Sequence, residues 1–211
     1  RGKCAQLVAG RSYAGGEEVC VSYGVRSAAE YLEEHGFVPF FNVGSESEGG
    51  GGGGNEGLHG SGQLAELTFA LEEGTTRCHD DKADILEQSG LDVQVAFEVS
   101  DAAGGLADPA MVQYLRLLLL DGADLFLLEP VFRNEVIDFM ALPVSEANEL
   151  AVGNLVIARC SAALAMMHQA IAKDDDMASF DSNPEARQRC LGTRRGLAAA
   201  VCYSERTALE A

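Results

Sequence analysis

The chain has 211 residues, 47% of them hydrophobic, so it is long enough to bury a sizeable core. Its 33 acidic and 15 basic residues give a formal net charge of -18, which disfavours nucleic-acid binding but leaves basic protein partners open. The six cysteines form no Cys-x-x-Cys pair and the four histidines share no ligand spacing, so neither a metal site nor a disulfide framework is indicated, and a reducing compartment fits best.

The first 43 residues predict a strand, a turn and a short helix. Val19, Val21 and Tyr23 alternate with polar or small residues, so a strand delivers Tyr23 to its end, where the next glycine permits a turn. Ser27 is placed as the N-cap of a helix over residues 27–34, with Glu30 three positions later as its capping-box partner.

Residues 44–63 differ sharply in composition from the rest of the chain. They are rich in Ser, Glu and Gly and include six consecutive glycines, a composition that buries almost nothing and is typical of a flexible linker or an inserted loop. A phosphate-binding loop is the alternative, but no Gly-Lys-Ser/Thr follows the tract.

From residue 64 onward the chain predicts mainly helices with a few short strands. Leu67, Phe69 and Leu71 alternate as in a strand, although Leu64, Leu67 and Leu71 would also fit a short helix. The next expected elements, each bounded by its own start or stop residues, are a helix over 82–89 capped by Asp80–Asp81 and stopped by Gly90, a strand over 93–99, and a helix opened by Asp108–Pro109.

Two further helices are expected toward the C-terminus. The first begins near Ser145, and its predicted buried face consists of Leu150, Leu155, Val156, Cys160, Ala163, Leu164, Met167 and Ile171. Polar residues interrupt this apolar run, so we expect no membrane span. The second begins at Asn183–Pro184 and carries five arginines, which we expect to pair with acidic groups.

The first segment resembles the closing part of a SET domain of the Rubisco large-subunit methyltransferase-like group. The shared pattern is an aromatic residue, Gly-Glu, an alternating strand ending in Tyr, then Ser-x-x-Glu and Gly-Phe, found here at Tyr13, 16–17, 19–23, 27–30 and 36–37. Residues 64–211 resemble the substrate-binding domain of the same group, on Asp80-Asp81-Lys82, the Leu115–Leu118 run, the helix start at 143–149 and the final Ser204-Glu205-Arg206.

The resemblance implies an α+β chain in which residues 1–43 are the β-rich end of a SET domain, 44–63 a linker or insertion, and 64–211 a mainly helical substrate-binding domain. It implies transfer of a methyl group from S-adenosylmethionine to a protein lysine. By resemblance, Tyr23 is the catalytic tyrosine that holds the target amine, and Phe37 and His35 line the cofactor or lysine channel.

The sequence departs from the family pattern at several positions. His35 stands where the family has Tyr, Ala28 where it has Asn, and Tyr31 where it has Leu. The Gly-rich cofactor loop and the Asn-His motif of the family are not found in these residues. Because Arg1 is not a start methionine, we expect the chain to be a fragment of a longer protein. Because the Gly-rich loop and the Asn-His motif are missing from it, we expect it to be inactive by itself.

The family suggests as protein substrate the Rubisco large subunit, aldolase or another lysine-bearing protein, and a chloroplast location, with cytoplasm or nucleus as the alternative. We expect a monomer that binds neither nucleic acid nor membrane. Three other interpretations stay open: a non-catalytic binding module with a degenerate SET tail, a protein-histidine methyltransferase, and a helical scaffold with a chance match.

Overall fold

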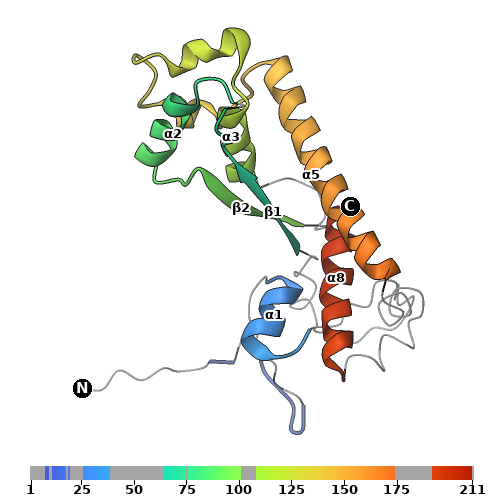
Figure 1. Ribbon diagram of the computed structural model, residues 1–211. Coiled ribbons are helices and arrows are strands. Elements are labelled where there is room, and N and C mark those ends of the chain that lie inside the picture. Colours follow the sequence, from blue (N-terminus) through green and yellow to red (C-terminus); the bar gives the residue numbers. More distant parts are fainter. Residues whose placement is uncertain are drawn as a thin grey trace.

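A two-stranded antiparallel sheet lies at the centre of the chain (Figure 1). The computed structural model describes residues 8–9, 11–17, 19, 26–38, 64–74, 76–100, 108–173 and 192–210. Strand β1 (Leu64–Ala70) pairs with β2 (Gln94–Ser100) in a register that places Leu67 opposite Phe97. Leu67 and Phe69 are buried while Thr68 between them is exposed, so the alternation in the sequence reports the two faces of the strand.

The main core packs between this sheet and helices α2 and α3. Helix α2 (His79–Gln88) connects the strands, and α3 (Pro109–Leu118) follows β2. The rings of Phe69, Phe97 and Tyr114 contact in series, with centroid separations of 6.4 and 5.5 Å, an arrangement typical of packed aromatic side chains. Six of the ten residues of α3 are buried, so α3 is the central helix of this core.

After α3 the chain forms a short helical segment and then one long helix. The 3-10 helix η1 (Gly122–Leu128) and the single turn α4 (Val136–Phe139) lead to α5 (Glu146–Ala172), which is 27 residues long. Ser145 caps α5 by accepting a hydrogen bond from the backbone N–H of Asn148. By length and hydropathy α5 could cross a membrane, so the polar interruptions that led us to expect no span do not exclude one.

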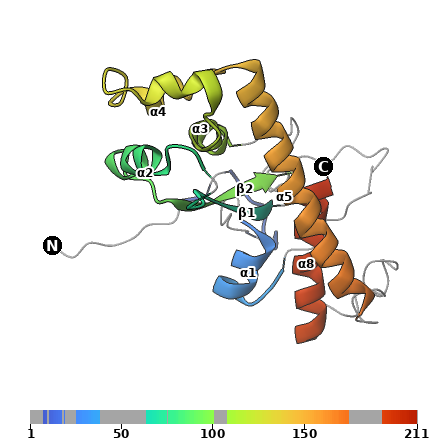
Figure 2. The ribbon, with the colours of Figure 1, turned by 45° about the horizontal axis from the view of Figure 1, so that its top comes forward.

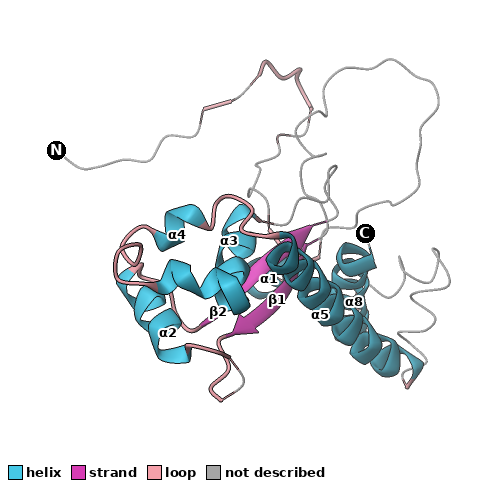
Figure 3. Cartoon of the chain, turned by 90° about the horizontal axis from the view of Figure 1, so that it is seen from above, coloured by secondary structure: helices cyan, strands magenta, loops and turns pink. Residues whose placement is uncertain are grey.

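Helix α8 (Arg194–Glu210) joins the two ends of the chain. It contacts the sheet, the C-terminal half of the structure through α5, and α1 (Ala28–His35) near the N-terminus. Figure 2 shows α8 alongside the lower end of α5, with α1 on the other side of α8, and Figure 3 shows α8 beside α5 from above. A single helix therefore places the segment that resembles a SET domain against the helical domain.

The α+β prediction is confirmed, as are the start signals at Ser27, Asp108–Pro109 and Ser145. The structure corrects two details. Asp80 and Asp81 lie inside the first turn of α2, and Cys78 in a left-handed conformation is its N-cap. Leu150 is 64% exposed and is therefore not part of the buried face of α5.

Two predicted elements lie outside the residues that the structure describes. The first is the strand that ends in Tyr23, and the second is the helix start at Asn183–Pro184. Two of the five arginines expected on that last helix, Arg194 and Arg195, lie in the first turn of α8.

Candidate functional site

Three rings gather at the C-terminal end of α1. Tyr31 lies one turn before His35, and Gly36 adopts φ +75° as the C-cap, which turns the chain so that Phe37 comes back over the helix. The Tyr31 and Phe37 ring centroids are 5.6 Å apart, and the His35 and Phe37 rings are stacked at 6.1 Å with an angle of 29° between their planes. The structure thus brings together the two residues that the resemblance assigned to the channel.

The ring cluster of Tyr31, His35 and Phe37 offers one apolar aromatic wall. Tyr31 is buried, whereas Phe37 is 43% exposed, so the outer face of Phe37 is open to a ligand. A flat heterocycle such as the adenine of S-adenosylmethionine fits such a face, because offset stacking on an aromatic ring is favourable. The described residues therefore fit one side of a cofactor or lysine channel.

Local polar contacts fix the helix that carries these rings. Ser27 and Glu30 form a reciprocal capping box, with the Ser27 N–H donating to the Glu30 carboxylate at 2.8 Å and the Glu30 N–H donating to the Ser27 hydroxyl at 3.1 Å. The Arg26 guanidinium lies 2.8 Å from Glu34. The capping box therefore defines the start of α1, and the Arg26–Glu34 pair joins that start to the last turn of the helix.

Helix α8 packs against the same end of the structure through small residues. Ala199 and Ala200 are buried, and Val38 and Tyr203 pack against them. Because alanine side chains are short, α8 approaches closely to the residue that follows Phe37. The helical domain therefore contacts the chain directly beside the ring cluster.

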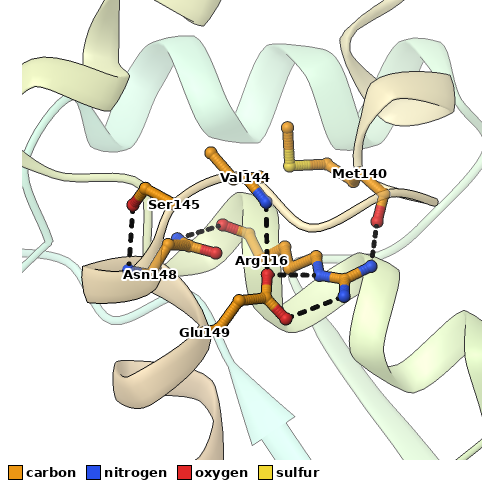
Figure 4. Close-up of polar contacts among 6 residues, drawn as sticks. All are labelled: Arg116, Met140, Val144, Ser145, Asn148 and Glu149. Atoms are coloured by element: carbon orange, nitrogen blue, oxygen red, sulfur yellow. Dashed lines mark hydrogen bonds and ion pairs between the residues drawn. The ribbon is translucent and has the colours of Figure 1, made fainter.

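A polar network holds α3 to the start of α5 in the helical domain (Figure 4). The Arg116 guanidinium donates to both carboxylate oxygens of Glu149 at 2.8 Å and to the Met140 carbonyl at 2.9 Å. Asn148 donates to the Arg116 carbonyl at 3.1 Å, and the Val144 N–H donates to Glu149 at 3.2 Å. The hydrogen bond from Arg116 lowers the pKa of Glu149, as expected for a bidentate pair.

A second buried cation lies in α2. Lys82 is 1% exposed, and its ammonium group donates to the carbonyls of Leu118 and Leu120 at 2.8 Å each. Leu118 is the last residue of α3 and Leu120 follows it closely, so Lys82 satisfies acceptors at the end of the helix that the helix leaves unpaired. Burial lowers the pKa of Lys82 to about 8, although Cys78 and Asp121 nearby act in the opposite direction.

The roles assigned to Tyr23, His35 and Phe37 stay predictions. Tyr23 lies outside the described residues, so its position relative to His35 and Phe37 stays a prediction. Sequence reasoning missed Tyr31 as a member of the ring cluster, although its spacing of four from His35 could have revealed it. It also missed Arg116 and Lys82, whose partners lie 24 or more positions away in the sequence.

Comparisons with known proteins identify a family and several relatives that this chain is similar to. A family model described as Rubisco LSMT substrate-binding matches residues 73–209. The chain is 35% identical over 130 residues to the chloroplastic ribulose-1,5 bisphosphate carboxylase/oxygenase large subunit N-methyltransferase of Nicotiana tabacum, covering 62% of this chain and 26% of that protein. It is 36% identical over 97 residues to the chloroplastic fructose-bisphosphate aldolase-lysine N-methyltransferase of Arabidopsis thaliana, covering 46% and 20%.

Solved structures extend the likeness toward the N-terminus. The structure of Rubisco LSMT bound to sinefungin and monomethyllysine superposes with a TM-score of 0.59 and 27% identity, over 92% of this chain and 39% of that one. The matched part of the chain covers only about a quarter or less of the length of the two relatives from tobacco and Arabidopsis.

Proposed function

The chain belongs to the Rubisco LSMT substrate-binding family, and from this premise we propose that it is part of an S-adenosylmethionine-dependent protein-lysine N-methyltransferase. The observation that carries the proposal is the extent of the structural likeness. The family model begins at residue 73, whereas the likeness to Rubisco LSMT covers 92% of the chain and so includes part of the segment before residue 64. A helical domain alone would not explain that extension.

The residues of the first segment have distinct roles in this proposal. S-adenosylmethionine supplies a methyl group on a sulfonium, and the protein has mainly to orient the target amine. The Tyr23 hydroxyl holds that amine, and the exposed face of Phe37 with the stacked His35 ring forms one wall of the channel. Burial in such a channel favours the neutral, nucleophilic form of a lysine side chain.

The domain assignment follows from the same premise. Residues 1–43 close a SET domain, 44–63 form a linker or insertion, and 64–211 form the domain that docks the protein substrate. The Rubisco large subunit and aldolase are the first proteins to test as substrates, because the relatives' names specify them. The same names support a chloroplast location. The proposed enzyme acts as a monomer, without binding nucleic acid or membrane.

The test is methyl transfer by the full-length protein. It is incubated with radiolabelled S-adenosylmethionine and either Rubisco or aldolase, and the label is mapped by mass spectrometry. We expect label on lysine and a fall of about 100-fold in turnover for Tyr23→Phe, because an oriented hydroxyl at the reacting centre is lost. Tyr13→Phe, a matched change outside the ring cluster, is expected to keep wild-type turnover.

Three other outcomes would each change the proposal. Label on histidine would assign the protein to histidine methylation. Absence of label on any protein, with the fold intact by circular dichroism, would favour the non-catalytic binding module. Turnover by the 211-residue chain alone would contradict our expectation that this segment is inactive without the Gly-rich loop and the Asn-His motif.

A further inference from the structure

A groove lies between the end of α2 and the start of β2, on the helical domain. Its volume is about 460 Å³, and its lining comprises Ala83, Asp84, Glu87, Gly90, Leu91, Asp92 and Val93. Val93, at its floor, is 48% exposed, so the groove presents an apolar side chain to solvent. At Gly90, φ is +71° and the position of a side chain would be open space, so the turn leaves the groove unobstructed.

The titratable residues that line this groove are all acidic. Its three titratable lining residues are Asp84, Glu87 and Asp92. Asp84 pairs at 2.9 Å with Arg133, a residue that does not line the groove. In the described part of the chain, no ion pair joins Glu87 or Asp92 to a cation, so two carboxylates remain available to an external cation.

A second groove provides an internal comparison. It is about 170 Å³ in volume, lies between β1, the end of α3 and α5, and also has an apolar floor. Its two charged lining residues, Glu72 and Arg159, lie 3.7 Å apart and pair with each other. Of these two grooves in the described part of the chain, the smaller one has paired charges, whereas the α2–β2 groove has a net negative lining.

The walls of the α2–β2 groove are held in place by hydrogen bonds. The Val93 carbonyl accepts from the Leu71 N–H at 2.8 Å and from the Tyr114 hydroxyl at 2.9 Å. The Leu91 N–H donates to the Leu86 carbonyl at 2.9 Å. A surface fixed in this way loses little conformational freedom on binding.

We propose that the α2–β2 groove docks a cationic segment of the protein substrate, with an apolar side chain over Val93 and lysine or arginine side chains beside Glu87 and Asp92. Charge complementarity selects this occupant, because an acidic rim attracts basic segments and repels acidic ones. Identifying the occupant as the methylation substrate rests on the proposed function above. Binding of a basic segment does not depend on it.

The first experiment measures binding by the 211-residue chain itself, so no methyl transfer is needed. The probe is a fluorescein-labelled peptide of alternating lysine and leucine, and the affinity is measured by fluorescence anisotropy at low ionic strength. We expect the double variant Glu87→Gln/Asp92→Asn to bind about fivefold more weakly, since each exposed charge pair contributes modestly. Val93→Ser tests the apolar floor and is expected to weaken binding about twofold.

The control variant is Glu33→Gln/Glu73→Gln, which removes the same net charge at exposed positions of α1 and of the loop after β1. It is expected to bind the peptide like the wild type. Equal weakening in both double variants would show that the overall charge of -18, and not the groove, attracts the peptide, and this would overturn the proposal. Equal affinity of the wild type and the groove variant would also overturn it.

The second experiment uses the full-length protein and separates this proposal from the proposed function. The groove variant is expected to raise KM for the protein substrate about fivefold while kcat and KM for S-adenosylmethionine stay unchanged. If the wild type methylates no protein, the proposed function fails while the peptide binding still tests the groove. If methylation occurs with an unchanged KM in the groove variant, the groove proposal fails and the proposed function stands.

Discussion

Two buried cationic side chains in the helical domain have different kinds of hydrogen-bond partner. Arg116, 9% exposed, has a carboxylate partner in Glu149 that accepts two of its hydrogen bonds. Lys82, more deeply buried, is bonded to two neutral carbonyls. Consequently burial lowers the pKa of Lys82 to about 8, whereas Arg116 lowers the pKa of its partner Glu149.

The difference shows that the Arg116 contacts require a positive charge, whereas the Lys82 contacts require only N–H donors. A guanidinium that joins three segments through fixed bidentate geometry cannot be replaced without leaving a carboxylate unpaired. A lysine that serves two carbonyls can keep both hydrogen bonds as a neutral amine, because the amine still has two N–H groups. We therefore expect Arg116 to contribute to the free energy of unfolding whether or not the pH is alkaline. We expect the contribution of Lys82 to change with pH.

The largest expected effect is that of Arg116→Met. Removal of the guanidinium leaves the Met140 carbonyl without its donor and leaves Glu149 without its cation, with the Val144 N–H still donating to it, and we expect a loss of about 3 kcal/mol in the free energy of unfolding. The measurement is urea denaturation followed by circular dichroism. Arg133→Met is the matched control, since the carboxylates of Asp81 and Asp84 that it contacts are about half exposed, and it should cost less than about 1 kcal/mol. Equal costs for the two variants would contradict the comparison.

Lys82→Met tests the second half of the comparison. The pKa of Lys82 is lower in the folded chain, about 8, than its ordinary value of 10.5, so the unfolded chain binds more protons between these values. The free energy of unfolding should therefore rise as the pH rises from 8 to 10.5. Because one unit of pKa corresponds to about 1.4 kcal/mol, the rise is on the order of 3 kcal/mol.

The measurement for Lys82 is the difference in unfolding free energy between wild type and Lys82→Met at several pH values. Groups that titrate in both proteins cancel in that difference. A difference that does not change between pH 8 and 10.5 would show that Lys82 keeps its charge at alkaline pH, and would remove the contrast with Arg116.

The smallest expected effect concerns Glu205, for which the described part of the chain provides no ion pair. Burial, with Glu66 nearby as a second cause, raises the pKa of Glu205 above 4.5, so its ionisation in the folded chain costs stability as the pH rises past that value. Glu205→Gln should therefore stabilise the chain at pH 7 by about 0.5 kcal/mol, or roughly 1–2 °C in Tm. At pH 4 the gain should disappear, since Glu205 is then largely protonated. A gain that persists at pH 4 would assign the effect to packing.

The elements that local sequence determines were predicted well. The capping box at Ser27, the Pro at the start of α3 and the serine cap of α5 each act within four residues, so a single segment contains the whole signal. The predicted buried face of α5 was wrong at Leu150, which is exposed, because this helix is apolar around most of its circumference. Periodicity then identifies a helix but not the face that is buried.

The candidate site could be predicted only where its parts are close in sequence. His35 and Phe37 were selected by resemblance, and their contact follows from a spacing of two around the Gly36 turn. The Arg116–Glu149 pair spans 33 positions, and a pair of that kind depends on how helices pack, which no local pattern reports. The position of Tyr23 stays a prediction for a different reason, because it lies outside the described residues.

The packing of α8 on α1 has a consequence for synthesis on the ribosome. His35 ends α1 and Arg194 begins α8, so the chain must grow by 159 residues (194 minus 35) before α1 meets its partner helix. At about 5–20 residues per second this takes roughly 8–32 s. During that interval α1 and the aromatic rings at its end lack this contact, so the segment that resembles a SET domain is completed only when the last helix has been made.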